Sequence, residues 1–398
     1  MTAAPIDLLS PSAFADGQPW AQFRWLRAHD PVHRHPEPDG RGFWAVTRYH
    51  DVHTVSRDPR TFSSWAGGVM LPDGDPGQLE AARRMMLYMD APDHTRHRRL
   101  VSPGFTPRAA ERWAERIRAL ATRIVDAVEA QGGCDFVADV AGEMPSLVVA
   151  ELMGIPDDDA RRLYHLTEVM HSADPALTDE QRVGAMVEML TYGAGVAAAK
   201  RHAPADDLVT VLVRSTIDGE ALSDDDLMWF FLLLVNAGGD TTRNLVAGGV
   251  EALMAEPAQW EALRHDPDGL MPAAVEELLR FVSPVVHMRR TATADTVLAG
   301  QPIAEGDKVV VFYGSANRDE AVFGADAERL DLRRDPNPHV AFGGGGPHFC
   351  LGAHIARLEI ASLLREVVTR LPGLRLDGPV ERLTSTFIAG PKRMPVAW

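Results

Sequence analysis

Residues 342–352 read Phe-Gly-Gly-Gly-Gly-Pro-His-Phe-Cys-Leu-Gly, and the four consecutive glycines decide how this part of the chain folds. Glycine loses much conformational entropy on folding, so four in a row indicate tight turns or a close approach of backbone. A phosphate-binding loop is one interpretation, but no Lys-Ser/Thr pair follows. Cys350 stands instead at the start of the next helical stretch, where free N–H groups and the helix dipole stabilise a thiolate and lower its pKa. A thiolate among glycines suits an axial ligand of haem iron; the alternative is a buried cysteine beside a flexible loop.

The composition of the 398-residue chain excludes several classes of protein. Its formal net charge of −16 argues against nucleic acid as the main partner. The two cysteines, Cys134 and Cys350, cannot build a disulfide framework or an all-cysteine metal site. The most apolar run, 228–235, is far shorter than the roughly 20 residues of a membrane span, and no signal peptide is visible. We therefore expect a cytoplasmic protein without a membrane span.

Most of the chain carries helical signals, with a few short strand signals between them. The expected helices span 109–129, 224 to beyond 251, 272–280 and 351–371, and the expected strands are 42–46 (running into a helix near residue 51) and a pair formed by 296–298 and 308–312. Ser223 is the expected N-cap of the long helix, with three aspartates in its first turn. No linker or repeat interrupts the chain, so we predict one domain over 1–398, mainly α with small sheets.

A second motif, Ala237-Gly-Gly-Asp240-Thr241-Thr242, lies in the middle of the long expected helix. Two glycines inside a helix cost about 1 kcal/mol each relative to alanine, which favours a local opening. Thr241 could turn its hydroxyl into that opening, and Asp240 could supply protons from the solvent side. The alternative is a cap, with the glycines ending one helix and Asp240 beginning another.

A third motif is Glu277-Leu-Leu-Arg280. Residues three apart share a helix face, so these two side chains can form an ion pair. Such pairs are common on protein surfaces and contribute little there. Taken alone, this motif predicts nothing more than a surface pair.

The glycine–cysteine segment resembles the haem-ligand signature of the cytochrome P450 family. Gly346, His348, Cys350 and Gly352 stand at the expected offsets, whereas Phe342 lies eight residues before the cysteine instead of the commoner seven. This spacing resembles the Phe-Gly-Gly-x-Gly version of some actinobacterial members that oxidise lipids and sterols. The resemblance extends from about Trp44 to near the C-terminus, with the motifs in the family's order, and implies the cytochrome P450 fold.

The resemblance assigns roles to the motif residues. It implies that Asp240 and Thr241 are the acid–alcohol pair, and that Glu277 and Arg280 form a structural ion pair completed by an arginine from the coil-rich segment, with Arg318 preferred over Arg329. His94 and Arg98 would lie about 40° apart around a helix and could reach one haem propionate together. The full set of implied haem-contacting residues is His94, Arg98, Arg290, His348 and Cys350.

The same resemblance indicates which segments cover the substrate. The region 65–89 is rich in methionine, which lines adaptable apolar sites well. The candidate pocket residues are Met86, Leu87, Val235, Ala237, Val286, His287, Phe387 and Ile388. Each of them could equally belong to the core. Together they predict a mainly hydrophobic substrate, with His287 able to donate one hydrogen bond.

The resemblance implies a haem-thiolate monooxygenase that holds heme b and inserts one atom of O2 into a hydrophobic substrate. Thiolate ligation favours cleavage of the O–O bond. No flavin or nicotinamide domain is visible, so electrons would come from a ferredoxin and its reductase, docking near Arg96 and Arg99. A terpenoid, steroid or branched lipid is favoured as substrate, and a monomer is expected. A peroxide-driven peroxygenase is the alternative enzyme, although the Asp240–Thr241 pair favours O2 activation; a haem-thiolate sensor would need an output module, and no residues are left over for one.

Overall fold

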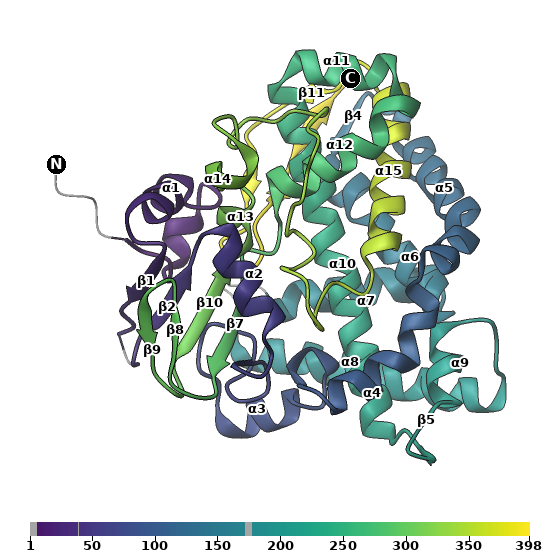
Figure 1. Cartoon of the computed structure of the whole chain (residues 1–398). Helices are drawn as coiled ribbons and strands as arrows, with labels where there is room; N and C mark the ends of the chain where they lie inside the picture. Colours follow the sequence, from purple (N-terminus) through teal and green to yellow (C-terminus); the bar gives the residue numbers. More distant parts are fainter. Residues whose placement is uncertain (1–5, 39, 172–176) are drawn as a thin grey trace.

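Helix α10 (Asp224–Ala255) runs through the centre of the molecule, and other helices pack around it (Figure 1). The computed structural model describes residues 6–38, 40–171 and 177–398. The remaining helices are α1 (Trp20–His29), α2 (Tyr49–Arg57), α3 (Pro76–Ala82), α4 (Asp93–Val101), α5 (Pro107–Glu129), α6 (Glu143–Met153), α7 (Asp157–His171), α8 (Asp179–His202), α9 (Leu208–Val213), α11 (Pro257–His265), α12 (Pro267–Val282), α13 (Tyr313–Ala316), α14 (Glu320–Phe323) and α15 (Ala353–Arg370). In the described part of the chain, no helix combines the length and the apolar character of a membrane span.

The start of α10 confirms the predicted cap. The Ser223 hydroxyl accepts from the backbone N–H of Asp226, and the Asp226 side chain accepts in return from the backbone N–H of Ser223. The helix is continuous to Ala255, so the alternative in which Asp240 begins a new helix is wrong. Gly238 and Gly239 instead allow neighbouring helices to approach: a Cβ at Gly238 would lie 2.8 Å from Val149 of α6, and one at Gly239 would lie 3.2 Å from Tyr164 of α7.

The largest sheet has the strand order β1-β2-β10-β7-β3 and lies to one side of the helices (Figure 1). Its strands are β1 (Val32–His35), β2 (Phe43–Val46), β3 (Phe62–Ser63), β7 (His287–Ala292) and β10 (Lys308–Phe312). The smaller sheets contain β4 (Gly133–Asp135), β5 (Thr216–Ile217), β6 (Glu220–Ala221), β8 (Thr296–Leu298), β9 (Gln301–Ile303), β11 (Arg375–Leu376), β12 (Glu381–Arg382), β13 (Pro391–Arg393) and β14 (Pro395–Ala397).

Two predicted boundaries and one predicted pairing are wrong. Strand β8 pairs with β9 across a tight turn in which Ala299 and Gly300 have positive φ, whereas β10 is buried along its whole length between β2 and β7. Helix α12 begins at Pro267 because Asp266 caps it, which leaves Pro272 inside the helix. Helix α15 begins at Ala353, so Cys350 precedes it by three residues.

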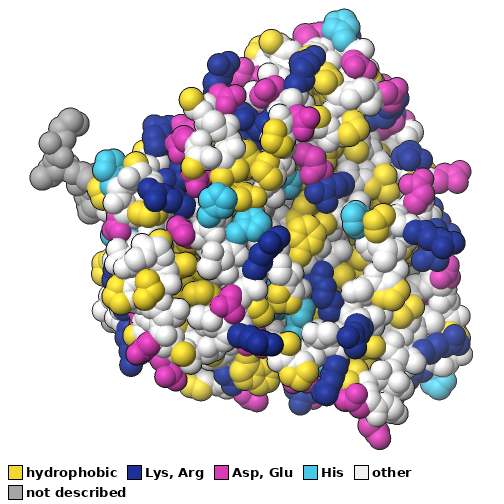
Figure 2. All heavy atoms as spheres, in the orientation of Figure 1, with side chains coloured by type: hydrophobic (Ala, Val, Ile, Leu, Met, Phe, Trp, Pro, Cys, Tyr) yellow, Lys and Arg dark blue, Asp and Glu magenta, His cyan; other side chains and the backbone are white. Residues whose placement is uncertain are grey.

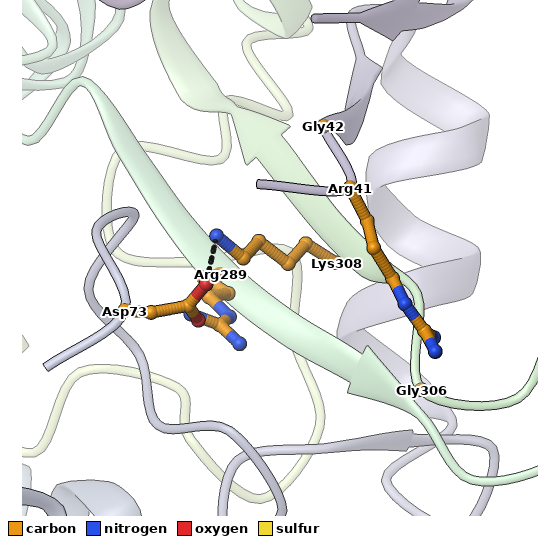
Figure 3. A pocket seen from close by; sticks show the side chains of 6 residues that line it. All are labelled: Arg41, Gly42, Asp73, Arg289, Gly306 and Lys308. Atoms are coloured by element: carbon orange, nitrogen blue, oxygen red, sulfur yellow. Dashed lines mark hydrogen bonds and ion pairs between the residues drawn. The ribbon is translucent and has the colours of Figure 1, made fainter. Parts of the chain in front are cut away.

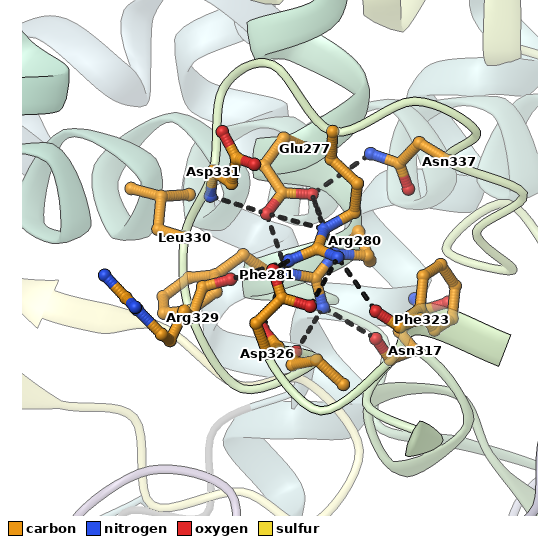
Figure 4. A network of polar contacts seen from close by, with 12 residues as sticks. Glu277, Arg280, Phe281, Asn317, Phe323, Asp326, Arg329, Leu330, Asp331 and Asn337 are labelled. Carbon is orange, nitrogen blue, oxygen red and sulfur yellow. Dashed lines mark hydrogen bonds and ion pairs between the residues drawn. The ribbon is translucent and has the colours of Figure 1, made fainter. Parts of the chain in front are cut away.

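The Glu277–Arg280 pair is fully buried and is not a surface pair (Figure 4). The two side chains make two hydrogen bonds of 2.7 Å, and the Arg280 guanidinium also donates to the carbonyls of Asn317, Ala327 and Arg329 at 2.6 to 2.8 Å. Every charge is therefore matched inside the protein, which a buried ion pair requires. The network fastens segment 317–337, which is irregular apart from α14, to α12.

The third arginine of this network is Arg334, not Arg318 or Arg329. The Arg334 Nε lies 3.3 Å from a carboxylate oxygen of Glu277, and Arg334 is held by the Phe323 carbonyl and by Asp326. Arg329 contributes only its backbone carbonyl. Arg318 donates to the Phe281 carbonyl, and its guanidinium lies 3.5 Å from the centre of the Trp20 ring.

A buried carboxylate lies where α15 packs on α10. Glu359 of α15 is 5% exposed, and burial raises the pKa of its carboxyl to about 8, an effect that a hydrogen bond with Thr242 of α10 reduces. Because the pKa is raised in the folded state, the folded protein binds this proton more tightly than the unfolded chain does. The stabilisation is therefore present below pH 4.5, the ordinary value, and is lost as the pH rises towards 8.

We predict that Glu359→Gln flattens this pH dependence. Between pH 5 and pH 8 the wild-type free energy of unfolding should fall by on the order of 3 kcal/mol through this group, and the variant should lose most of that fall. Denaturant unfolding of the holoprotein at the two pH values measures the effect. Glu366→Gln, on the same helix but paired with Arg370, is the control. An equal fall in Glu359→Gln and wild type would contradict the assignment.

Candidate active site

The glycine loop that carries Cys350 is seated on the end of α2. Gly343, Gly345 and Gly346 have φ values of 101°, 84° and 76°, which side-chain-bearing residues rarely adopt. A Cβ at Gly346 would collide with the carbonyl of Ser56, and one at Gly344 would lie 2.6 Å from the Ser56 hydroxyl. The loop closes when the Cys350 N–H donates to the Phe342 carbonyl at 2.9 Å. The sequence prediction of tight turns and close backbone approach is confirmed.

The surroundings of Cys350 differ from the sequence prediction. The residue is accessible to solvent, but protein surrounds its sulfur on most sides, and this burial raises the pKa of the thiol. The Gly352 N–H and the charges of Arg98 and Arg357 act in the opposite direction without outweighing burial. The predicted lowering of this pKa by a helix N-terminus is therefore wrong. A thiol in such a place is deprotonated when a metal cation binds it.

Four basic residues converge beside Cys350 from three separate segments. The rings of His94 (α4) and His348 (glycine loop) lie 4.3 Å apart, and Arg98 (α4) donates to the Pro347 and Phe349 carbonyls at 3.0 and 2.6 Å. Arg290 (β7) is 5% exposed, and its charge lowers the pKa of both histidines. Burial is the larger cause and brings the pKa of His94 to about 4.

These four residues make no ion pair with a carboxylate among the described residues. The nearest carboxylate, Asp90, accepts instead from the Ser63 hydroxyl and the Ser64 N–H. Arg290 is a buried cation and Arg98 a half-buried one, and a buried cation without a counter-ion is unfavourable, so the cluster suits an anionic partner. The two propionates of a haem, with its iron at the Cys350 sulfur, fit this donor set.

The middle of α10 presents its accessible side at Ala237 and Thr241. Ala237 is exposed and Thr241 is half-buried, although the helix is buried immediately after them. The Thr241 hydroxyl donates to the Ala237 carbonyl at 3.1 Å, and the buried Asn244 side chain donates to the Asp240 carbonyl at 2.7 Å. Asp240 is 7% exposed and lies 3.3 Å from Arg243. The predicted hydroxyl and carboxyl are thus adjacent on one helix, as the motif requires.

The predicted pocket residues divide into two groups. Ala237 is exposed, and Leu87 and Phe387 are half-buried, whereas Met86, Val235 and Ile388 are 8% exposed or less. The Val286 N–H donates to the Phe387 carbonyl at 2.9 Å, and Val285 bridges to Ile388, so these two segments lie side by side.

His287 and Val286 are core residues, and their prediction as pocket residues is wrong. Alternation along β7 places His287 on the opposite face from Arg290, with the Phe312 and Phe387 rings 5.8 and 5.7 Å from its own. Both ring nitrogens lack a hydrogen-bond partner among the described residues, and burial lowers the pKa of His287 to about 4. Val286 is fully buried in the same apolar cluster as Phe312.

On that opposite face of β7 lies an open hollow of about 200 Å³ (Figure 3). It is lined by Arg41, Gly42, Asp73, Arg289, Gly306 and Lys308. Asp73 pairs with Arg289 at 2.7 Å and with Lys308 at 2.6 Å, which ties the segment before α3 to the sheet. This contact had no signal in the sequence, because its partners are over 200 residues apart.

Comparison with known proteins agrees with this geometry. The sequence model of the family described as Cytochrome P450 matches residues 188–372, which include Asp240, Glu277 and Cys350. The chain is similar to the steroid C26-monooxygenase of Mycobacterium tuberculosis (38% identity, covering 98% of this chain and 92% of that protein). It is also similar to the methyl-branched lipid omega-hydroxylase of the same species (42% identity, covering 90% and 85%).

A solved structure gives the same result. The Mycobacterium marinum cytochrome P450 CYP268A2 in complex with pseudoionone superposes with a TM-score of 0.93, at 40% identity and over 100% of both chains. Similarity of this extent, together with a cysteine loop and a cationic cluster that fit a haem, means that the chain belongs to the cytochrome P450 family and is a monooxygenase.

Proposed function

We propose that this monooxygenase inserts one atom of O2 into a terpenoid, steroid or methyl-branched lipid, using heme b and electrons from a ferredoxin and its reductase. The observation that supports it best is the convergence of the Cys350 loop, four basic residues without carboxylate partners, and the Asp240–Thr241 pair. A bound haem supplies the activation of O2 and the transfer of one oxygen atom to a C–H bond.

The residues of this chain would hold the haem from two directions. The Cys350 sulfur would ligate the iron, while His94, Arg98, Arg290 and His348 would pair with the propionates. Charge-assisted hydrogen bonds of this kind are roughly twice as strong as neutral ones. The hydrogen bonds that the Arg98 guanidinium donates to the loop carbonyls would then fix Cys350 and the propionate-binding side chains relative to each other.

Asp240 and Thr241 would transfer protons on the side of the haem away from Cys350. Asp240 is buried beside the Arg243 guanidinium, so its carboxyl group is positioned to pass protons from the Glu168 side of the helix towards Thr241. The Thr241 hydroxyl donates to a carbonyl of its own helix and can rotate to donate elsewhere. General acid–base groups positioned in this way contribute about 10²- to 10⁴-fold to a rate.

The substrate class rests on the relatives and on the lining. The names of the two relatives specify a steroid and a methyl-branched lipid, and the solved structure holds pseudoionone, a branched apolar ketone. The candidate lining residues that remain after the corrections are apolar: Met86, Leu87, Val235, Ala237, Phe387 and Ile388. An apolar pocket of this composition favours a bulky hydrophobic ligand.

The ferredoxin would dock on the face that carries the cysteine loop. Lys, Arg and His side chains gather around the hollowed centre of the face shown in Figure 2. Arg57 is exposed and lies beside the loop, since a Cβ at Gly345 would be 2.8 Å from its Nε. Neither Arg57 nor Arg99 has a carboxylate partner within the described ranges. Arg96 instead pairs with Asp93 and Asp218, so Arg57 and Arg99 are the better candidates for an acidic partner.

We predict that Cys350→Ser loses thiolate ligation. A serine hydroxyl is far less acidic than a thiol and donates less electron density to iron. The reduced protein with carbon monoxide should therefore lose the spectrum of a thiolate-ligated haem, and turnover with ferredoxin and reductase should fall to background. Cys134→Ser, remote from the loop in strand β4, is the control. A Cys350→Ser protein that keeps both signals would overturn the ligand assignment.

We predict that Thr241→Ala binds haem and substrate normally but uncouples NADH consumption from product formation. Without the hydroxyl, product formed per NADH should fall at least about tenfold while hydrogen peroxide rises. Thr369→Ala is a matched control, because the Thr369 hydroxyl also donates to the carbonyl four residues earlier on a helix. Unchanged coupling in Thr241→Ala, or turnover supported by peroxide alone, would contradict the relay and favour a peroxygenase.

We predict that at least one steroid, terpenoid or methyl-branched fatty acid shifts the haem spin state with a Kd in the micromolar range, about −8 kcal/mol of binding. Small polar aromatics and hydrophilic macrolides serve as the comparison set. If only members of the comparison set shift the spectrum, the substrate class is wrong while the monooxygenase activity stands.

A further inference from the structure

Arg243 of α10 is shared between two carboxylates. Its Nη2 lies 3.3 Å from Asp240, one turn earlier on the same helix, and its Nη1 contacts Glu168 of α7. The side chains of Arg243 and Asp240 are 6% and 10% exposed, whereas that of Glu168 is 41% exposed. The cluster therefore runs from the surface at Glu168 to the buried carboxylate beside Thr241.

The guanidinium of Arg243 has little freedom to move elsewhere. It lies 5.3 Å from the centre of the Tyr164 ring of α7, and a Cβ at Gly142, just before α6, would be 3.5 Å from its Cδ. Tyr164 also faces Gly239, so α7 packs directly against the segment that carries Asp240. A change in the Arg243–Glu168 contact therefore alters the interaction between the Arg243 guanidinium and Asp240.

The charges explain what the shared contact does. A buried guanidinium with one carboxylate partner pairs with it as closely as the geometry allows, because an unpaired buried charge is costly. A second carboxylate divides that attraction. With Glu168 present, Asp240 therefore receives only part of the donor capacity of Arg243.

We propose that Glu168 is a positioning residue for proton delivery: by sharing Arg243, it leaves the Asp240 carboxylate able to take up a proton and pass it towards Thr241. This inference rests on the proposed monooxygenase function and extends it to α7. Without the charge of Glu168, the attraction of Arg243 acts on Asp240 without this competitor and holds that carboxylate more tightly.

Glu168→Gln tests the proposal against a closely matched control. Glu188 of α8 is 42% exposed and pairs with Arg162, which is also on α7, at 2.6 Å. Glu188→Gln therefore removes a similarly exposed charge that also pairs with an arginine of α7, without contact to Asp240. The experiment compares both variants and Glu168→Asp with wild type, all as holoenzymes with ferredoxin, reductase and the substrate that gives the largest spin-state shift.

In Glu168→Gln we expect product formed per NADH to fall about fivefold to tenfold and the kinetic solvent isotope effect on turnover to increase about twofold. The substrate Kd and the carbon monoxide spectrum should stay at the wild-type values. Glu168→Asp should recover part of the coupling, and Glu188→Gln should match wild type.

Two results would overturn the proposal. One is a Glu168→Gln protein with the same coupling and isotope effect as Glu188→Gln; the other is a coupling loss accompanied by an equal loss of substrate affinity, which indicates a merely structural contact. Failure of the proposed function looks different, because the wild-type protein itself would then lack ferredoxin-driven turnover.

Discussion

The contact between the glycine loop and the end of α2 is the constraint on which the site depends. Because Gly346 lies against the Ser56 carbonyl with no space for a Cβ, the loop can approach α2 closely enough for Cys350 to bond back to Phe342. His348 and the carbonyls that Arg98 contacts belong to the same loop. A side chain at Gly346 would therefore displace the sulfur and part of the cationic cluster together.

Buried charges in this molecule fall into two kinds, and the difference separates scaffold from site. Glu277 and Arg280 are fully buried, yet every polar atom of the pair is engaged by Arg334, by backbone carbonyls or by neighbouring donors. The second kind is the basic cluster, in which His94 and Arg290 are buried and Arg98 and His348 are half-buried. It is held in place mainly by backbone and hydroxyl contacts, without a carboxylate partner in the described structure. A buried ion pair whose polar atoms are all engaged belongs to the scaffold, whereas a partly buried cluster of basic residues without an anion indicates a ligand.

The parts of the site that the sequence predicted are those encoded within a few residues. Glu277 and Arg280, Asp240 and Thr241, and the glycines before Cys350 each form a local pattern whose geometry follows from helix periodicity or from glycine conformation. Arg334 was missed because it comes from an irregular segment, where no periodicity shows which side chain turns inward. His287 was misplaced because a strand changes face at every residue, so the motif located the strand without its register.

The difference between backbone and side-chain contacts bears on how the protein selects its substrate. One proposed wall of the pocket, formed by Phe387, Ile388 and α10, is rigid, because backbone hydrogen bonds join residues 387–388 to the buried segment 285–286 and because α10 is continuous. The facing segment, from Ser64 to Asp90, is held to the sheet by one backbone hydrogen bond, from the Arg289 N–H to the Val69 carbonyl, and otherwise by side chains: Asp73 contacts Arg289 and Lys308, and Asp90 contacts Ser63 and Ser64. Between these two aspartates the chain forms only the short helix α3 and one turn of 3₁₀ helix at Met86. Because this segment lies outside the glycine loop, substitutions there can change the proposed pocket without disturbing Cys350, so substrate preference and the cysteine loop can vary independently.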